Sequence, residues 1–275
     1  MRRLYISDLD GTLFNKEKKI SEASAEMINQ CIDKGMLFSI ATARMPYGCD
    51  YRLEKIRMNL PGIVTNGVFL YDFQNKRYLS GEAMEKACVK QVLKVFKENS
   101  LSCFVYMFQS GRIRIYYDEK QMEEQTQYYS DRALESCEEV RLVEDYEEIL
   151  DQGDACYITY TGEKKVLEPV CRSLDKIQGI SYSFYLNIYN QRYCLEIFSH
   201  TANKQNALKR LKKLADCQEV VVFGDNYNDM PMIEIADRSY APANALEEVK
   251  AQVNGVLEDC DHDGVAKFLK KEMFE

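Results

Sequence analysis

Apolar and amphipathic segments alternate along the first part of the chain. Residues 3–7 predict a short strand that runs into Asp8, and the mostly apolar run 36–42 predicts a second strand, buried on both faces. Between them, apolar residues at i, i+4 spacing predict a helix, with Ser21 as its cap and Gly35 as its stop. Strands that alternate with helices across short links predict a parallel sheet covered by helices.

The middle of the chain, from about residue 81 to residue 191, has a different pattern. Tyrosine becomes frequent, and two strand-like segments flank Ser110-Gly111 in the manner of a hairpin. Helices are expected near 84–98, 119–135 and 163–177, and strands near 154–160 and 180–186. This order predicts a separate α+β unit with an open sheet.

The α/β pattern returns after this middle segment. Strands are predicted over 193–198 and 220–223, with an amphipathic helix over 204–215 between them and a last helix over 265–273. The apolar stripe of the helix at 204–215 consists of Ala207, Leu208, Leu211 and Leu214. The expected fold class is α/β, a Rossmann-like, doubly wound parallel-sheet core of residues 1–81 and 192–275 with an inserted α+β domain at 82–191.

Composition narrows the classes of partner. The 275 residues include 36 Lys and Arg against 44 Asp and Glu, a net charge of −8, and 46 % are hydrophobic, enough for a sizeable core. An acidic chain without a long basic run is a poor candidate for binding nucleic acid or an anionic membrane. No apolar stretch approaches the roughly 18 residues that span a bilayer, and no signal-peptide region precedes Asp8, so a cytoplasmic location is expected.

The ten cysteines are scattered and form no Cys-x-x-Cys pair. In a reducing compartment they are expected to be buried free thiols. The only histidines, His200 and His262, have no cysteine partners at ligand spacing, so a zinc site is not expected.

Four polar segments stand where a predicted strand ends or a predicted helix begins, which is where open α/β sheets place ligands. The first contains Asp8 and Asp10. Residues two apart on an extended chain project to the same side, so both carboxylates can face one cavity, and a divalent cation would relieve their repulsion. Gly11 permits the sharp departure that follows. Taken alone, the segment fits a solvated acidic turn equally well.

The second segment is Thr42-Ala43-Arg44, directly after a buried strand. It offers a hydroxyl, backbone amides and a guanidinium, all of which suit an anion, although Thr42 could as easily cap the next helix. The third is Lys204, in the first turn of a predicted helix with Asn203 as its cap. A cation there opposes the helix dipole, and this misfit suggests a function.

The fourth segment, Gly224 to Asp229, directly follows a predicted buried strand. Asp225 and Asp229 add two carboxylates, with the amide of Asn228 beside them. Together the four segments supply carboxylates for a metal ion and donors that can hold an anion. Their order along the chain, more than any one of them, points to a catalytic site.

This ordered set resembles the four signature motifs of the haloacid dehalogenase superfamily: Asp8-x-Asp10-Gly11-Thr12, then Thr42, then Lys204, then Gly224-Asp225-x-x-Asn228-Asp229. The inserted domain between the second and third motifs resembles the type IIB cap of the Cof-type phosphatase subfamily. Smaller similarities are Asn66-Gly67, Asn244-Ala245 and Asp263-Gly264-Val265-Ala266. Ala43 and Gln205 stand where the family commonly has glycine, which puts local backbone geometry in question.

The resemblance implies a Mg2+-dependent phosphatase of small phosphorylated metabolites, such as sugar phosphates, that works through an aspartyl-phosphate. Asp8 would be the nucleophile, and Asp10 would protonate the leaving alkoxide and later activate water. The implied Mg2+ ligands are Asp8, the backbone carbonyl of Asp10 and Asp225, with Asp229 close behind. The implied phosphate-binding groups are Thr42, Lys204, Asn228 and the amides of Leu9 and Ala43.

Other functions compete with this one. A sugar phosphomutase would use the same chemistry, and a non-catalytic phospho-ligand-binding regulatory protein would use the same scaffold, although a binder needs no nucleophile. Residues 259–264 imitate the start of a calcium loop, but Lys270 stands where that loop needs a glutamate. The sequence leaves the individual phosphate ester and the oligomeric state open.

Overall fold

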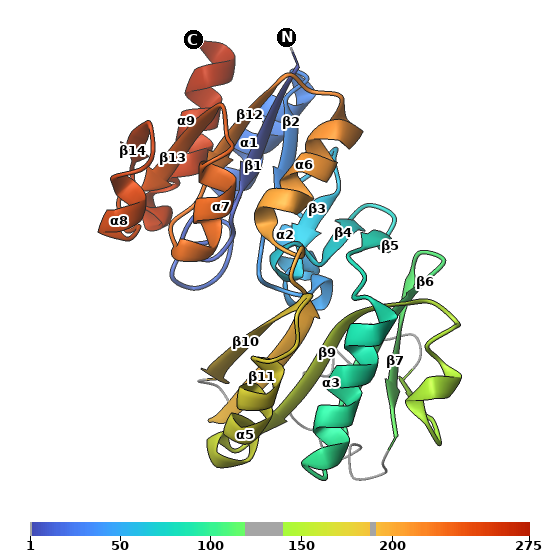
Figure 1. Cartoon of the computed structure of the whole chain (residues 1–275). Coiled ribbons are helices and arrows are strands. Elements are labelled where there is room, and N and C mark those ends of the chain that lie inside the picture. The colour runs from blue at the N-terminus through green and yellow to red at the C-terminus, as the bar shows by residue number, and fades with distance from the viewer. Residues whose placement is uncertain (1, 119–139, 188–190) are drawn as a thin grey trace. The chain divides into compact units, whose positions relative to one another are not determined.

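A computed structural model describes residues 2–118, 140–187 and 191–275 (Figure 1). The chain forms two compact units: Met1–Leu79 with Asn203–Glu275 make the first, and Ser80–Ala202 make the second. The helix predicted near 119–135 lies outside the described residues.

The first unit is built on a parallel sheet of five strands in the order β14-β13-β12-β1-β2. From edge to edge these strands are Gly255–Leu257, Arg238–Pro242, Glu219–Phe223, Arg3–Ser7 and Leu37–Ile40. A parallel bridge between Ala41 and Ile63 continues it to β3 (Gly62–Val64), which forms a three-stranded sheet with β4 (Phe69–Asp72) and β5 (Arg77–Gly81). The fourth strand in this order, β1, is parallel to both of its neighbours, β12 and β2.

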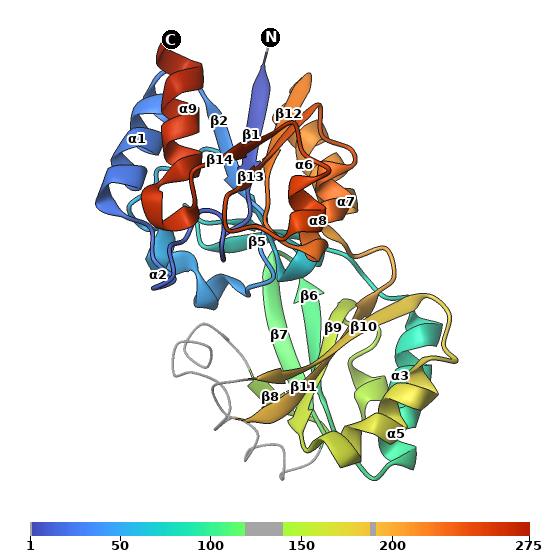
Figure 2. The ribbon, with the colours of Figure 1, turned by 90° about the vertical axis from the view of Figure 1, so that its left-hand side faces the viewer.

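Helices cover both faces of this sheet, as the prediction of a doubly wound fold requires. Figure 2 shows α1 (Glu22–Asp33) and α9 (Gly264–Phe274) on one face and α6 (Lys204–Ala215) and α7 (Met230–Ile233) on the other. Two further short helices of this unit are α2 (Asp50–Leu53) and α8 (Glu247–Lys250). Ser21 caps α1 by accepting from the Ser24 amide, as predicted.

The core of the first unit follows from strand alternation. Leu4, Ile6, Val220 and Val222 point to the same face and pack against Ala207, Leu208 and Leu211 of α6. Leu214, expected on the same stripe, is 58 % exposed, and Ala215 is the buried residue in the last turn of the helix. The prediction was wrong there because the spacing of apolar residues alone does not show where a short helix diverges from the sheet.

The second unit contains a six-stranded sheet in the order β10-β11-β9-β6-β7-β8. In that order the strands are Ile180–Asn187, Arg192–Ser199, Asp154–Gly162, Phe104–Gln109, Arg112–Tyr117 and Val140–Leu142. Among the described residues of this unit, α3 (Lys86–Glu98) and α5 (Lys164–Leu174) are the α-helices, and both contribute to one apolar core against the sheet (Figure 2). The predicted hairpin across Ser110-Gly111 is confirmed, with β6 antiparallel to β7.

The return from the inserted domain lies later in the chain than the boundary predicted at 192. Residues 192–199 form β11, which pairs with β10 and β9 inside the second unit, and the first unit resumes only at Asn203. An alternating strand pattern does not reveal which of two sheets the strand joins, and that is why the boundary was misplaced. The nine cysteines within the described residues are buried and free, as expected. None of the helices among these residues could cross a membrane.

Candidate active site

Three neighbouring strands of the first unit deliver the predicted polar segments to one edge of the sheet. Because β12, β1 and β2 are adjacent and parallel, Asp225, Asp8 and Thr42 all follow the carboxyl ends of their strands. The Asp8 amide donates to the carbonyl of Phe223 at 2.9 Å, which continues the β1–β12 pairing into the site. Segments some two hundred residues apart in sequence therefore meet here.

Lys204 joins two of these segments. It is the first residue of α6, with the side chain of Asn203 capping the helix by accepting from the Asn206 amide at 2.8 Å. Its ammonium is 1 % exposed and donates to Asp8 Oδ1 at 2.6 Å and to Asp229 Oδ1 at 2.7 Å. Burial opposes the charge of Lys204, but the two carboxylates outweigh it and raise the pKa of the lysine. The unfavourable interaction between the lysine charge and the helix dipole is thus compensated by two carboxylates.

Asp229 is held from both sides. Its Oδ1 accepts from Lys204, and its Oδ2 accepts from the backbone amides of Asp225 at 3.0 Å and Asn226 at 3.2 Å. Asn226 and Asp229 form a capping box at the start of the short 3-10 helix Tyr227–Asp229. With both oxygens engaged and no exposure, Asp229 shapes the loop around the neighbouring carboxylates.

Burial and mutual repulsion make the remaining carboxylates resist ionisation. The pKa of Asp8 is raised to about 8, chiefly by burial and then by Asp229 and Asp225, against the opposing effect of Lys204. The pKa of Asp225 is raised to about 6, again chiefly by burial, while the hydroxyl of Thr12 favours its ionised form by donating to Oδ1 at 2.9 Å. Fully ionised, the three carboxylates Asp8, Asp225 and Asp229 would outnumber the one lysine, and a bound cation would favour that ionised form.

The donor set fits a divalent cation. Asp8, Asp225 and Asp229 each present a carboxylate oxygen, and these oxygens lie within 4.8 Å of one another. Oxygen ligands with uncompensated negative charge are what Mg2+ binds in proteins. The space beside Asp225 is kept open by Gly11, because a Cβ there would lie 2.5 Å from Asp225 Oδ2. Gly11 also has a φ of +82°, which favours glycine on its own account.

Asp10 is not part of that carboxylate cluster. Its side chain accepts two hydrogen bonds from Arg44, both 2.6 Å long, in a bidentate pair, and Arg44 also donates to the Gly48 carbonyl at 3.0 Å. The Asp10 side chain remains 42 % exposed. Asp8 and Asp10 thus leave the strand from neighbouring positions but face different partners, and the partner of Asp10 comes from the second predicted segment.

The groups expected to hold an anion differ in how far the fold already engages them. Thr42 is buried, and its Oγ1 accepts from the Arg44 amide at 3.1 Å, which leaves its own proton available. Within the described part of the chain, the amides of Leu9 and Ala43 donate to no acceptor, although Leu9 is fully buried. Backbone N–H groups at buried positions normally have partners, so the Leu9 amide suits a bound anion, whereas Ala43 is exposed and its amide is open to solvent.

Three residues to which the sequence analysis assigned no role, Asn66, Asn244 and Thr12, make hydrogen bonds to the predicted segments. The Asn228 amide donates to Asn66 Oδ1 at 3.2 Å, and the Asn244 amide donates to the Gly11 carbonyl at 2.7 Å. Asn66 and Asn244 both belong to the smaller similarities to the family, and those similarities could have pointed to them. Thr12, the partner of Asp225, lies inside the first motif but had no assigned role.

The acidic segment at 259–264 is used within the fold. Asp259 accepts from the amides of Asp261 and His262, and Asp263 accepts from the hydroxyls of Ser21 and Ser24. These side chains join the start of α9 to the start of α1.

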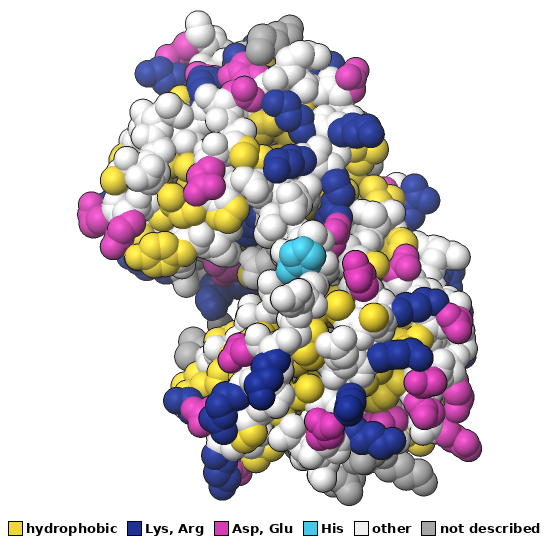
Figure 3. Space-filling model, viewed as in Figure 1, with side chains coloured by type: hydrophobic (Ala, Val, Ile, Leu, Met, Phe, Trp, Pro, Cys, Tyr) yellow, Lys and Arg dark blue, Asp and Glu magenta, His cyan; other side chains and the backbone are white. Residues whose placement is uncertain are grey.

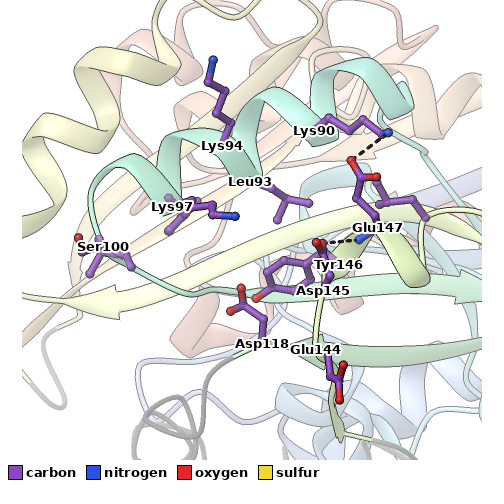
Figure 4. Close-up of a pocket in the computed structure, with 13 residues that line it drawn as sticks. Lys90, Leu93, Lys94, Lys97, Ser100, Asp118, Glu144, Asp145, Tyr146 and Glu147 are labelled. Atoms are coloured by element: carbon purple, nitrogen blue, oxygen red, sulfur yellow. Dashed lines mark hydrogen bonds and ion pairs between the residues drawn. The ribbon is translucent and has the colours of Figure 1, made fainter.

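A separate cavity of about 310 Å3 lies in the second unit between α3 and residues 144–150 (Figure 4). Lysines of α3 face acidic side chains across it, and Lys90 pairs with Glu147 at 3.2 Å. None of the predicted site residues lines it. On the face of the molecule seen in Figure 3, basic and acidic side chains are interspersed.

Comparisons with known proteins show the family of the chain. The model of the haloacid dehalogenase-like hydrolases matches residues 5–269. A 5-amino-6-(5-phospho-D-ribitylamino)uracil phosphatase of Bacillus subtilis is 24 % identical over 279 residues, covering 95 % of each chain. A pyridoxal phosphate phosphatase of Escherichia coli is 25 % identical and covers 97 % of each chain.

Solved structures show the same fold. A haloacid dehalogenase-like hydrolase from Bacteroides thetaiotaomicron aligns with a TM-score of 0.73 at 24 % identity, covering 99 % of this chain and 100 % of that one. A protein of Thermotoga maritima aligns with a TM-score of 0.75 at 21 % identity, covering 98 % and 97 %. The predicted α/β fold class is confirmed. Because the family model spans nearly all of the sequence, the chain belongs to the haloacid dehalogenase-like hydrolases, as its resemblance to the Cof-type phosphatases predicted.

Proposed function

We propose that this protein is a Mg2+-dependent phosphatase that hydrolyses phosphomonoesters of small metabolites through an aspartyl-phosphate. The observation that carries the proposal is the buried cluster in which Lys204 joins Asp8 to Asp229 beside Asp225. A nucleophilic carboxylate, a fixed cation and an excess of acidic ligands are the parts that phosphoryl transfer to a protein carboxylate needs.

In this proposal Mg2+ is held by the carboxylates of Asp8 and Asp225 and by the backbone carbonyl of Asp10, with Asp229 supporting the loop. When bound, the ion offsets the repulsion between the anionic nucleophile and the anionic phosphoryl group. The fit rests on the oxygen-only donors within 4.8 Å of one another and on the opening that Gly11 leaves beside Asp225.

Asp8 is the proposed nucleophile. Lys204 engages its Oδ1, so Oδ2 is the oxygen that attacks phosphorus while the bond from phosphorus to the leaving oxygen breaks. Asp10 is the proposed acid and base. Arg44 engages both of its oxygens, so Asp10 must be released from Arg44 and take up a proton before it gives that proton to the leaving oxygen, and it then takes a proton from the water that releases phosphate. Arg44 holds the Asp10 side chain in a defined orientation at the edge of the site.

The phosphoryl oxygens are assigned to Lys204, the Thr42 hydroxyl, Asn228 and the amides of Leu9 and Ala43. The Leu9 amide is supported by its burial and by its lack of an acceptor among the described residues, and the Ala43 amide is assigned by the resemblance alone. Lys204 and these donors would stabilise the negative charge that builds on the equatorial oxygens.

The first unit is the proposed catalytic domain, and the second is the proposed cap domain, which selects the leaving group. The relatives named for pyridoxal phosphate and for a phosphoribityl compound support a small phosphorylated metabolite as the substrate. A further relative, from Yersinia enterocolitica, is named an HMP-PP phosphatase and is 26 % identical over 285 residues.

The test is hydrolysis of p-nitrophenyl phosphate by the purified protein with Mg2+ and with EDTA. We expect turnover with Mg2+ only, and a loss of at least about 1,000-fold in kcat for Asp8→Asn, because an amide cannot serve as the nucleophile. The matched control is Asp151→Asn, which changes an exposed carboxylate in an ion pair with Lys86. Activity that survives Asp8→Asn would contradict the nucleophile assignment, and phosphate binding without turnover would favour a regulatory binding protein.

A further inference from the structure

The turn between β3 and β4 is strained. Its three residues, Thr65, Asn66 and Gly67, have φ angles of +52°, +50° and +99°. Asparagine and glycine tolerate this region, but a β-branched threonine rarely occupies it. Backbone strain of this kind persists only where the surroundings impose it, and it occurs preferentially at functional sites.

The contacts that impose it come from the proposed phosphate-binding segments. The Thr65 amide donates to the carbonyl of Arg44 at 3.0 Å, and the Asn66 amide donates to the carbonyl of Thr42 at 3.0 Å. The turn is therefore tied by two backbone hydrogen bonds to the segment that carries the Thr42 hydroxyl.

The same turn packs against the start of α6. A Cβ on Gly67 would lie 2.2 Å from the carbonyl oxygen of Asn203, so only glycine permits this approach. The Gly67 carbonyl in turn accepts from Arg210 of α6 at 3.0 Å. The residue after Asn203 is Lys204, so the turn also borders the segment with the buried cation.

The side chain of Asn66 contacts the fourth polar segment, Gly224 to Asp229. Its Oδ1 accepts from the Asn228 amide at 3.2 Å. A primary amide has two N–H groups, and fixing one of them fixes the direction of the other. We propose that Asn66 is a positioning residue, which holds the Asn228 amide so that its second N–H is aimed at the phosphoryl group. This inference rests on the proposed function.

The test replaces Asn66 with glycine. Glycine keeps the left-handed backbone and removes the side chain that carries the accepting oxygen. Measured with p-nitrophenyl phosphate as substrate and inorganic phosphate as inhibitor, we expect KM and the inhibition constant for phosphate to rise roughly 3- to 10-fold. We expect kcat to change less than about twofold, since the contact is made alike in the ground and transition states.

Two further variants separate positioning from a structural role. Lys76→Gly relaxes another left-handed residue, with φ +49°, in the turn before β5, and we expect unchanged kinetics. In an Asn228→Ala background, Asn66→Gly should cause no additional loss, because Asn66 acts through Asn228. The thermal midpoint of Asn66→Gly should lie within a few degrees of that of Lys76→Gly.

Each other outcome overturns the inference. Wild-type kinetics in Asn66→Gly would show that the contact does not matter, and additive losses in the double variant would show that Asn66 does not act through Asn228. Failure of Asn66→Gly to fold while Lys76→Gly folds would make the side chain structural. If the wild type neither turns over the ester nor is inhibited by phosphate, the proposed function itself fails.

Discussion

A single cation, Lys204, neutralises part of the negative charge of the carboxylate cluster. It is buried with Asp8 and Asp229, and both ion pairs are shorter than 2.8 Å. Removing one member of a buried ion pair leaves an uncompensated charge, which destabilises a protein by about 3–5 kcal/mol, whereas the intact pair adds little net stability. A role in positioning Asp8 and Asp229 therefore explains these buried ion pairs better than a contribution to stability does.

Gly11 provides a test of the site at the level of one methyl group. Gly11→Ala adds a Cβ 2.5 Å from Asp225 Oδ2, in a backbone conformation with φ +82°. We expect weaker Mg2+ binding, at least about tenfold lower activity, and a loss of stability of about 2–5 kcal/mol from the combined backbone and steric effects. The thermal midpoint, measured at increasing Mg2+ concentrations, reports both the affinity for Mg2+ and the loss of stability.

Gly35→Ala is the control for this change. Gly35 also has a left-handed backbone, φ +93°, but nothing lies within 4 Å of the position of its Cβ. It should lose only the backbone contribution of about 1–2 kcal/mol and keep full activity. Equal Mg2+ affinity in the two variants would mean that the space beside Asp225 is not the metal site.

At the level of elements, the start of α6 must be well defined if Lys204 is to reach two carboxylates. The Asn203 side chain caps this end by accepting from the Asn206 amide. Asn203→Ala is expected to lower stability by about 1 kcal/mol and to raise KM, because the first turn carries the lysine. Asn203→Gly should lose only a few tenths of a kcal/mol.

Glu85→Ala serves as the comparison at another helix. Glu85 precedes α3 and makes no capping hydrogen bond with its side chain. Its replacement should leave both the thermal midpoint and KM unchanged. A loss of stability in Asn203→Ala without any change in KM would separate the cap from the position of Lys204.

The sequence predicted where the site residues lie because polar side chains directly after a buried strand, or a lysine in the first turn of a helix, are not needed for folding there. Asp8, Thr42, Lys204 and Asp225 were all found in this way, and they meet at one edge of the sheet. The contact between Arg44 and Asp10 was not foreseen, since side-chain direction after a turn depends on tertiary packing. The sheet to which residues 192–199 belong was misassigned for the same kind of reason.

Across the first unit, a charge network joins the two ends of the chain. Glu219 pairs with Arg3 at 2.7 Å and with Arg238 at 2.9 Å, and Glu272 of α9 pairs with Arg238 at 2.7 Å. The hydrogen bond from Arg238 is the main cause that lowers the pKa of Glu272. β1, β12, β13 and α9 are thus linked at the edge of the sheet opposite the site.

This network predicts a pH dependence of stability. A carboxylate whose pKa is lower in the folded state stabilises the protein above its unfolded pKa of about 4.5, and that contribution is lost as pH falls through the folded value. Glu272→Gln should therefore lower the thermal midpoint at pH 7 by about 1–3 °C, with the difference from wild type vanishing below about pH 3. Glu248→Gln, at an exposed position of α8, should show no difference at either pH.

The placement of β1 between β2 and β12 has a consequence for how the molecule forms during synthesis. β1 leaves the ribosome first, but its partner β12 begins more than two hundred residues later, at Glu219. Contacts of such long range form slowly, and until they do Asp8 lacks the β12 neighbour whose carbonyl its amide contacts. Three of the five strands of this sheet, β12, β13 and β14, are therefore late products of translation, and a chain truncated before Glu219 lacks the strand that leads to Asp225 and Asp229.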